Sequence, residues 1–214
     1  MNIRSRTPEE AYAPALALAK RQLARLDPVR IGALACVPFL REEGPSGSFT
    51  IPFLGTPYEV SWPEGDAHHA GVRSPADITT HILLLHYLLM ADGTPMTNQW
   101  IAFRALPGGM GYDAAFQGRS SFRLARQFGA DRPAFEAASL SLGGERLTFG
   151  DASFCFRALP SLWLAAVVHL ADDEFPAEAS ILFDGAANHY LPTEDLAVLG
   201  GLLTSRLVKA ARTL

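Results

Sequence analysis

The sequence of 214 residues contains only two cysteines, Cys36 and Cys155, and they lie far apart in the chain. No C-x-x-C pair occurs, and two thiolates cannot supply the ligand set of a structural zinc ion or an iron–sulfur cluster. An iron–sulfur cluster held by this chain alone is therefore excluded. Cys155 stands in an apolar stretch, where a cysteine usually acts as a small core residue.

The sequence also lacks an excess of positive charge and a long apolar run. Its 18 Lys and Arg residues are outnumbered by 22 Asp and Glu residues, and no basic stripe is present that would favour nucleic acid. The longest apolar run, 82–91, falls short of the roughly 20 residues of a membrane-spanning helix. The first 30 residues contain no signal-peptide core. We expect a cytoplasmic protein that binds neither nucleic acid nor membrane.

Short motifs of the common enzyme classes are missing as well. The sequence contains no G-x-S-x-G nucleophile elbow, no phosphate-binding G-x-x-x-x-G-K-[ST] loop and no zinc-binding H-E-x-x-H. Serine hydrolase, P-loop and zincin chemistry are therefore not indicated.

The residues that are present indicate a folded α+β protein. Hydrophobic residues make up 49% of the chain, and 13 Phe, five Tyr and three Trp supply core volume. Capping residues and apolar periodicity predict helices at 7–26, 28–35, 76–91, 112–128, 132–142 and from 193 to the end. Strands are predicted at 48–54, 58–62, 100–106, 153–159, 162–170 and 179–183, with one short strand between 144 and 150. Residues 38–48 and 63–71 are expected to be loops.

Helices at both termini, without strict strand–helix alternation, favour α+β over a doubly wound sheet. We expect a single domain over residues 1–214, with a mixed or antiparallel sheet packed against a central apolar helix at 76–91. Pro52 suggests an edge strand because proline cannot donate to a sheet ladder.

A glycine-rich turn follows the predicted strand at 100–106. Gly108 and Gly109 precede a helix, where backbone N–H groups of glycines can approach an anion, and Arg104 is nearby. A dinucleotide site is disfavoured because no strand–helix–strand unit surrounds the turn. The alternatives are an anion site and a plain tight turn.

Carboxylates and histidines form the other candidate groups. Asp173, Glu174 and Asp184 are candidates for a divalent metal site or for acid–base chemistry; the alternatives are a solvated turn and a structural pairing with Arg104. His86 and His189 are candidates for a single axial ligand of a metal-centred macrocycle, and each is also explained as an ordinary core or surface residue.

Several segments together resemble an uncharacterised bacterial family of unknown function that is associated with anaerobes. They are "TNQWIAFRALPGGMGYDAAF", "FGADRPAF", "FRALP", "DDEFPAEASILFD" and "YLPTEDLAVLG". Some members of that family carry an added four-cysteine iron–sulfur domain like that of corrinoid proteins, which this chain lacks. The resemblance implies a context near corrinoid or other tetrapyrrole metabolism, and it supplies no mechanism.

Three functions follow as hypotheses. The first is a binding protein for a small organic cofactor, such as haem or a corrinoid. Trp100, Phe103, Tyr112 and Phe116 would line its cleft, and Arg104 with the amides of Gly108 and Gly109 would hold an acid group. The second is an interaction subunit whose partner protein carries the chemistry, and the third is a metal-assisted enzyme that uses the three carboxylates. The oligomeric state is left open.

Overall fold

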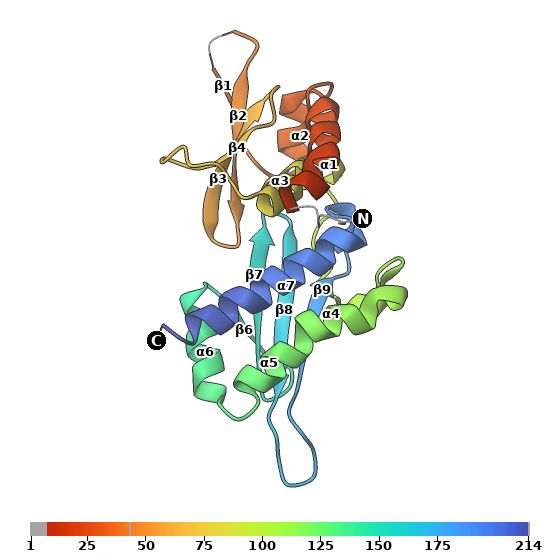
Figure 1. Cartoon of the computed structure of the whole chain (residues 1–214), viewed down its shortest axis with the longest axis vertical. Helices are drawn as coiled ribbons and strands as arrows, with labels where there is room; N and C mark the ends of the chain where they lie inside the picture. The colour runs from red at the N-terminus through yellow and green to blue at the C-terminus, as the bar shows by residue number, and fades with distance from the viewer. Residues whose placement is uncertain (1–7, 43, 214) are drawn as a thin grey trace, which may run out of the picture. The chain divides into compact units, whose positions relative to one another are not determined.

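The computed structural model describes residues 8–42 and 44–213 (Figure 1). The chain forms two compact units, Met1–Gly93 and Thr94–Leu214, and each contains helices and antiparallel strands. The α+β class is therefore confirmed. The single domain expected from the sequence stays a prediction, and the two units are described separately below.

The first unit contains a four-stranded antiparallel sheet in the order β1-β2-β3-β4 and three helices. Its elements are α1 (Pro8–Leu23), α2 (Pro28–Leu34), β1 (Phe39–Arg41), β2 (Gly47–Phe53), β3 (Thr56–Trp62), β4 (Ala67–His69) and α3 (Ile78–Met90). The predicted hairpin is β2 and β3. Two expected loops are wrong in part, because they contain β1 and β4, which are too short to show an alternating pattern. Pro52 lies in β2, which is between β1 and β3 and is not an edge strand. Strand β1 pairs only with Gly47–Phe49 of β2, so the described hydrogen-bond ladder between β1 and β2 ends before Pro52.

The apolar helix predicted at 76–91 is α3, the core helix of the first unit. Asp77 caps it by accepting a hydrogen bond from the Thr80 N–H (3.0 Å). The Tyr87 hydroxyl, which is fully buried, donates to the Ala35 carbonyl (2.6 Å). The larger sheet belongs to the second unit and has helices of its own.

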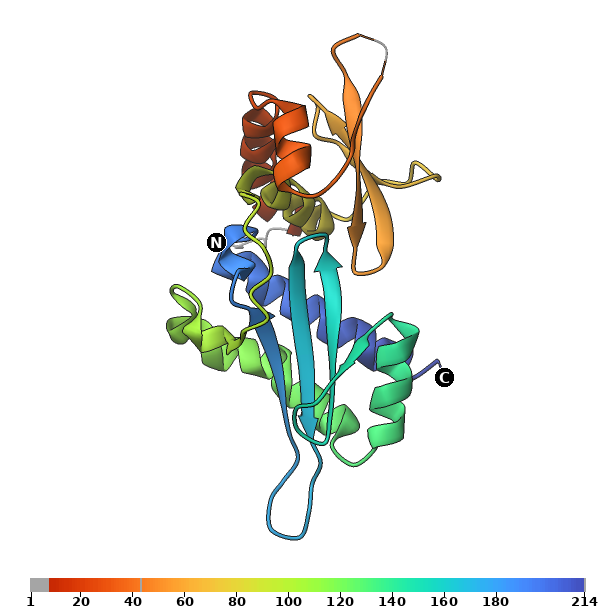
Figure 2. The same cartoon turned by 180° about the vertical axis from the view of Figure 1, so that it is seen from behind.

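The second unit contains a five-stranded antiparallel sheet in the order β5-β9-β8-β7-β6. Its strands are β5 (Trp100–Ala102), β6 (Glu145–Leu147), β7 (Ala152–Leu159), β8 (Leu162–His169) and β9 (Glu178–Asp184). Its helices are the 3₁₀ turns η1 (Phe103–Ala105), η2 (Gly109–Tyr112) and η3 (Ala187–His189), with α4 (Asp113–Arg119), α5 (Ser121–Phe128), α6 (Arg132–Ser141) and α7 (Thr193–Ala210). Helices α4, α5 and α7 cross one face of this sheet, as the views from front and back show (Figures 1 and 2).

Aromatic rings fill the space between this sheet and its helices. Phe103, Phe116 and Phe183 form one cluster, with ring centroids 4.3–6.1 Å apart. Gly200 of α7 gives the Phe116 ring room, since a Cβ at Gly200 would come within 2.7 Å of it. Cys155 is buried, as expected for a core thiol, and burial raises its pKa.

Two predicted elements end early in the second unit. The strand predicted at 100–106 stops at Ala102, and the chain turns into η1. The helix predicted at 112–128 is broken at Ser120, whose backbone (φ −122°, ψ −82°) leaves the helical region. Residues next to both interruptions, Phe103 and Ser121, line one pocket of this unit.

No helix in the described part of the chain combines the length and the apolar character needed to cross a membrane.

Candidate functional site

A pocket of about 420 Å³ lies in the second unit, between β9 and the helices α4 and α5. Its volume falls in the range of sites that bind small organic molecules. Residues from the turn after β5, from the two helices and from β9 line it: Ala102, Phe103, Arg104, Asp113, Phe116, Gln117, Ser121, Phe122, Ala125, Pro176, Ala177, Glu178, Ala179, Ser180, Ile181 and Leu182.

Two buried phenylalanines form the apolar floor. Phe103 and Phe116 are each 2% exposed, and their rings stack with centroids 4.3 Å apart and an angle of 19° between the planes. Phe122 also lines the pocket, yet 61% of its surface is exposed. An exposed aromatic beside a buried aromatic floor offers contact area to a flat or branched apolar ligand.

Arg104 follows Phe103 directly in the chain and brings a positive charge to the lining of the pocket. Among the residues that the structure describes, its guanidinium has no hydrogen-bond or ion-pair partner. The structural pairing with the acidic turn, considered from the sequence, is therefore not formed. A guanidinium in this position can bind a carboxylate through two parallel hydrogen bonds.

The break at Ser120 leaves the start of α5 uncapped. Serine at this position usually caps a helix, but the Ser120 hydroxyl donates to the Phe116 carbonyl instead (2.7 Å). Within the described residues, nothing accepts from the N–H groups of Ser121, Phe122 and Arg123. Ser121 is 8% exposed, lines the pocket, and has a hydroxyl without a partner in the same part of the chain. Free N–H groups at a helix start attract anions.

The opposite wall is the outer edge of β9. Strand β5 pairs only with Leu182–Asp184, so in the described part of the chain no strand pairs with Glu178–Ile181 on that side. The Gly185 N–H donates to the Gln99 carbonyl (2.8 Å), which sets the alternation of the ladder. By that alternation, Ala179 and Ile181 direct their N–H and C=O groups to the unpaired side, where no described residue bonds to them.

Of the predicted cleft residues, Phe103, Arg104 and Phe116 come together in this pocket, and four others do not. A glycine is required at position 109, because a Cβ there would lie 2.1 Å from the Phe103 carbonyl oxygen. The Gly109 N–H donates a hydrogen bond to the Leu106 carbonyl. The others outside the lining are Trp100, Gly108 and Tyr112. The Gly109 amide is therefore not available to an anion, and the rest of the anion site at the glycine turn stays a prediction.

The three predicted carboxylates do not converge. Asp184 is 3% exposed and accepts hydrogen bonds from the N–H groups of Thr97, Asn98 and Ala186 and from the Thr97 hydroxyl (2.8–3.1 Å). Asp173 and Glu174 are exposed in the connection before β9, whereas Asp184 ends that strand. Seven strand residues span about 20 Å, which is too far for one metal ion.

Neither predicted axial histidine lines the pocket. His86 lies on α3 in the first unit, and His189 is exposed in η3, with its Nδ1 atom 3.1 Å from the Thr94 Oγ1 atom. Over residues 8–42 and 44–213, no group of three or more His, Cys, Asp or Glu side chains is arranged to hold a metal ion.

With this geometry in place, the chain can be compared with known protein families. The chain belongs to the family described as "Domain of unknown function (DUF3786)". The family model matches residues 31–206, which include the entire lining of the pocket. No curated protein and no solved structure matches the chain significantly. The resemblance to a family of unknown function is thus confirmed, and the function has to be argued from the site.

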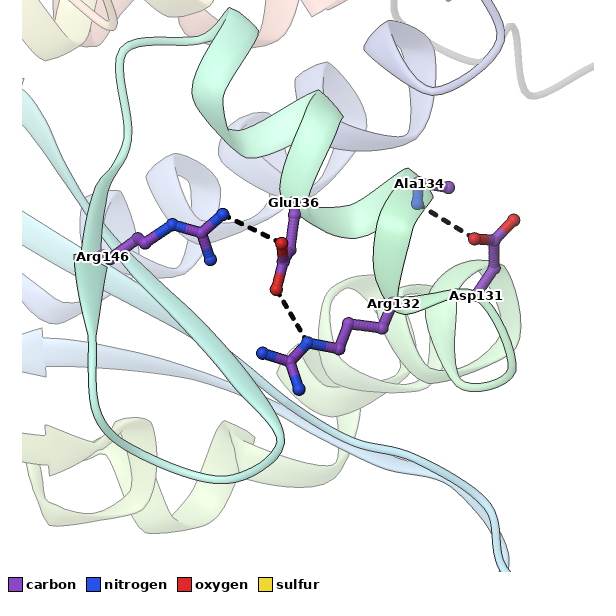
Figure 3. A network of polar contacts seen from close by, with 5 residues as sticks. All are labelled: Asp131, Arg132, Ala134, Glu136 and Arg146. Carbon is purple, nitrogen blue, oxygen red and sulfur yellow. Dashed lines mark hydrogen bonds and ion pairs between the residues drawn. The ribbon is translucent and has the colours of Figure 1, made fainter.

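Two other polar clusters in the structure are explained as structural. His81 is buried, lies 2.6 Å from the Gly65 carbonyl oxygen, and has a lowered pKa because burial disfavours its charged form. Glu136 on α6 binds Arg132 and Arg146 (2.7 and 2.9 Å) and ties this helix to β6 (Figure 3).

The two arginines that bond to Glu136, Arg146 first, lower its pKa to about 2. The two arginines are exposed, Glu136 is partly buried, and none of the three lines the pocket.

Sequence reasoning missed most of the polar lining. Gln117 and Asp113 bond to each other at the pocket (Nε2 to Oδ2, 2.6 Å), and Glu178 is an exposed residue of the same lining. The sequence shows that Asp113 and Gln117 are four residues apart on a predicted helix. No sequence pattern indicates that this helix faces the edge of a strand. Ser121 and Phe122 were hidden for the same reason.

Proposed function

We propose that the second unit binds a small organic molecule that carries an acid group, in the pocket between β9 and α4–α5. The observation that carries this proposal is Arg104, a guanidinium without a partner among the described residues, on the wall of a pocket floored by stacked phenylalanines. Its charge suits the acid group, and Phe103, Phe116 and Phe122 suit an apolar body.

A haem or a corrinoid belongs to this ligand class, because each has a macrocycle with acid or amide groups at its edge. The resemblance to an anaerobe-associated family with corrinoid-like fusions supports trying them first. The lining contains no histidine, so such a ligand would be held by its edge and its ring face, without axial ligation from His86 or His189.

Isothermal titration of the whole protein with 4-phenylbutyrate, haemin and cobalamin tests the proposal. We expect at least one of them to bind with a stoichiometry of one. Arg104→Gln should weaken that binding about tenfold or more, since a hydrogen bond to a charged group contributes about 1.5–3 kcal/mol.

Two matched variants control the experiment. Arg126→Gln removes the same charge from an exposed position on α5 outside the pocket, and Phe149→Ala removes an exposed ring elsewhere. Both should leave binding unchanged, whereas Phe122→Ala should weaken it. Absence of binding by all three probes, or equal affinities for Arg104→Gln and Arg126→Gln, would refute the proposal.

A further inference from the structure

The pocket has backbone groups as well as side chains on its walls. Along β9, Ala179 and Ile181 present N–H and C=O groups without partners among the described residues, and both line the pocket. An unpaired strand edge binds another extended backbone by adding a strand to the sheet. A ligand that contains only an acid and a ring would leave these groups unused.

The two ends of this edge differ in charge. Ala102 pairs with Leu182, and Arg104 follows it two residues later. Phe103 stacks on Phe116, and the uncapped start of α5 comes about one turn after Phe116. Free N–H groups, the Ser121 hydroxyl and a guanidinium therefore gather at the Leu182 end.

Glu178 begins β9 at the other end, where it is exposed and has no hydrogen-bond or ion-pair partner in the described part of the chain. Asp113, the other carboxylate of the lining, bonds to Gln117. Arg104 and Glu178 thus bring opposite charges to the two ends of this edge, and Asp113 keeps its own charge because its partner is a neutral amide.

The geometry points to a short peptide with free ends, bound in extended form along β9, as the ligand class; this rests on the function proposed above. Its carboxylate lies at Arg104, Ser121 and the start of α5, and its ammonium group lies near Glu178. Glu178 and Leu182 are four residues apart, about 13 Å in a strand, which a peptide of about four residues spans. Its apolar side chains on one face contact Phe122 and the phenylalanine floor.

Isothermal titration with the peptide Ala-Val-Ala-Phe and its three singly N-methylated forms tests this directly. In an added strand, alternate residues donate to the edge. We therefore expect N-methylation to weaken binding about tenfold at alternate amides and to have little effect at the amide between them. Equal affinities for all four peptides, or equal losses at all three amides, would overturn the inference.

The end groups have their own variants. Amidation of the peptide carboxylate should weaken binding to the native protein about tenfold. The same loss is expected for the control variant Ser141→Ala, because Ser141 lies outside the pocket. In the double variant Arg104→Gln/Ser121→Ala, which lacks the groups that would hold the carboxylate, amidation should weaken binding much less. Acetylation of the amino group should weaken binding to the native protein but not to Glu178→Gln. An acetylated peptide that binds the native protein as tightly as the free one would overturn the assignment of a free peptide.

The peptide inference and the function proposed above fail in different ways. If 4-phenylbutyrate binds through Arg104 and the peptide binds no more tightly than this acid, the peptide inference is wrong and the binding function stands. If neither the peptide nor any of the three acid and macrocycle probes binds, both are wrong. Ala179→Pro should also weaken binding of the peptide. The substitution removes an N–H that faces the pocket and leaves the hydrogen bonds between β9 and β8 in place.

Discussion

Gly200 and Gly201 are neighbours in α7, and substitution by alanine should change the stability of the protein differently at the two positions. A Cβ on Gly200 would lie 2.7 and 2.9 Å from the Cε2 and Cζ atoms of Phe116 and 3.4 Å from Ile181 Cγ2. At Gly201, outside the backbone of its own helix, no heavy atom of the described residues lies within 4 Å of such a Cβ. The two variants therefore share their helical context and differ in the packing around the new methyl group.

The magnitudes follow from two opposing effects. Alanine stabilises the interior of a helix by about 1 kcal/mol relative to glycine, and both variants gain this contribution. Overpacking of a filled core costs about 1–3 kcal/mol, and only Gly200→Ala incurs it, because the Phe116 ring is held between Phe103 and α7. We expect Gly201→Ala to be more stable than the native protein and Gly200→Ala to be equal or less stable.

Thermal unfolding followed by circular dichroism checks the comparison. A difference of about 1–3 kcal/mol corresponds to melting temperatures roughly 2–12 °C apart for a chain of this size. Because Phe116 forms the pocket floor, Gly200→Ala should also change the affinity for 4-phenylbutyrate, whereas Gly201→Ala should not. Equal melting temperatures would show that the Phe116 ring yields freely, and the packing argument would then be wrong.

Two further predictions concern carboxylates outside the pocket. Asp184→Ala should lower the free energy of unfolding in urea by at least about 3 kcal/mol, because it leaves several N–H donors without their acceptor, and Asp184→Asn should cost less; equal losses would contradict this. Because the folded-state pKa of Glu136 is lowered from 4.5 to about 2, its contribution to stability is present above pH 4.5 and lost as the pH falls towards 2. The melting temperature of Glu136→Gln should therefore be below that of the native protein at pH 7 and approach it near pH 2, whereas the exposed control Glu64→Gln should show no such convergence.

Local signals in the sequence predicted most of the regular elements. Asp131, which precedes the helix predicted at 132–142, caps it as expected by accepting a hydrogen bond from the Ala134 N–H. The alternating segments that became β7, β8 and β9 were also found, because long buried strands have strong patterns. Strands of three residues, such as β1 and β4, have too few positions to show a pattern.

The arrangement of these elements was harder to predict, for a physical reason. Helix α3 is apolar on nearly all sides, so its sequence indicates burial but does not indicate which sheet buries it. The same holds for the carboxylates: Asp173 and Asp184 are near each other in sequence, yet a strand between them extends their separation. Residues that are near each other in sequence lie close in space only where a helix or a turn brings them together.

The pocket itself exists because two regular elements stop early. Had β5 continued as predicted to residue 106, it would have paired with β9 at Ala179 and Ile181 and covered that edge. Had the helix run unbroken from residue 112 to 128, carbonyl groups of the preceding turn would have accepted from Ser121, Phe122 and Arg123. Sequence reasoning extended both elements through these points, so it found the aromatic floor and missed the free backbone groups on either side. Those groups are the part of the site that selects for a peptide, and the alternating effect of N-methylation is the measurement that would show it.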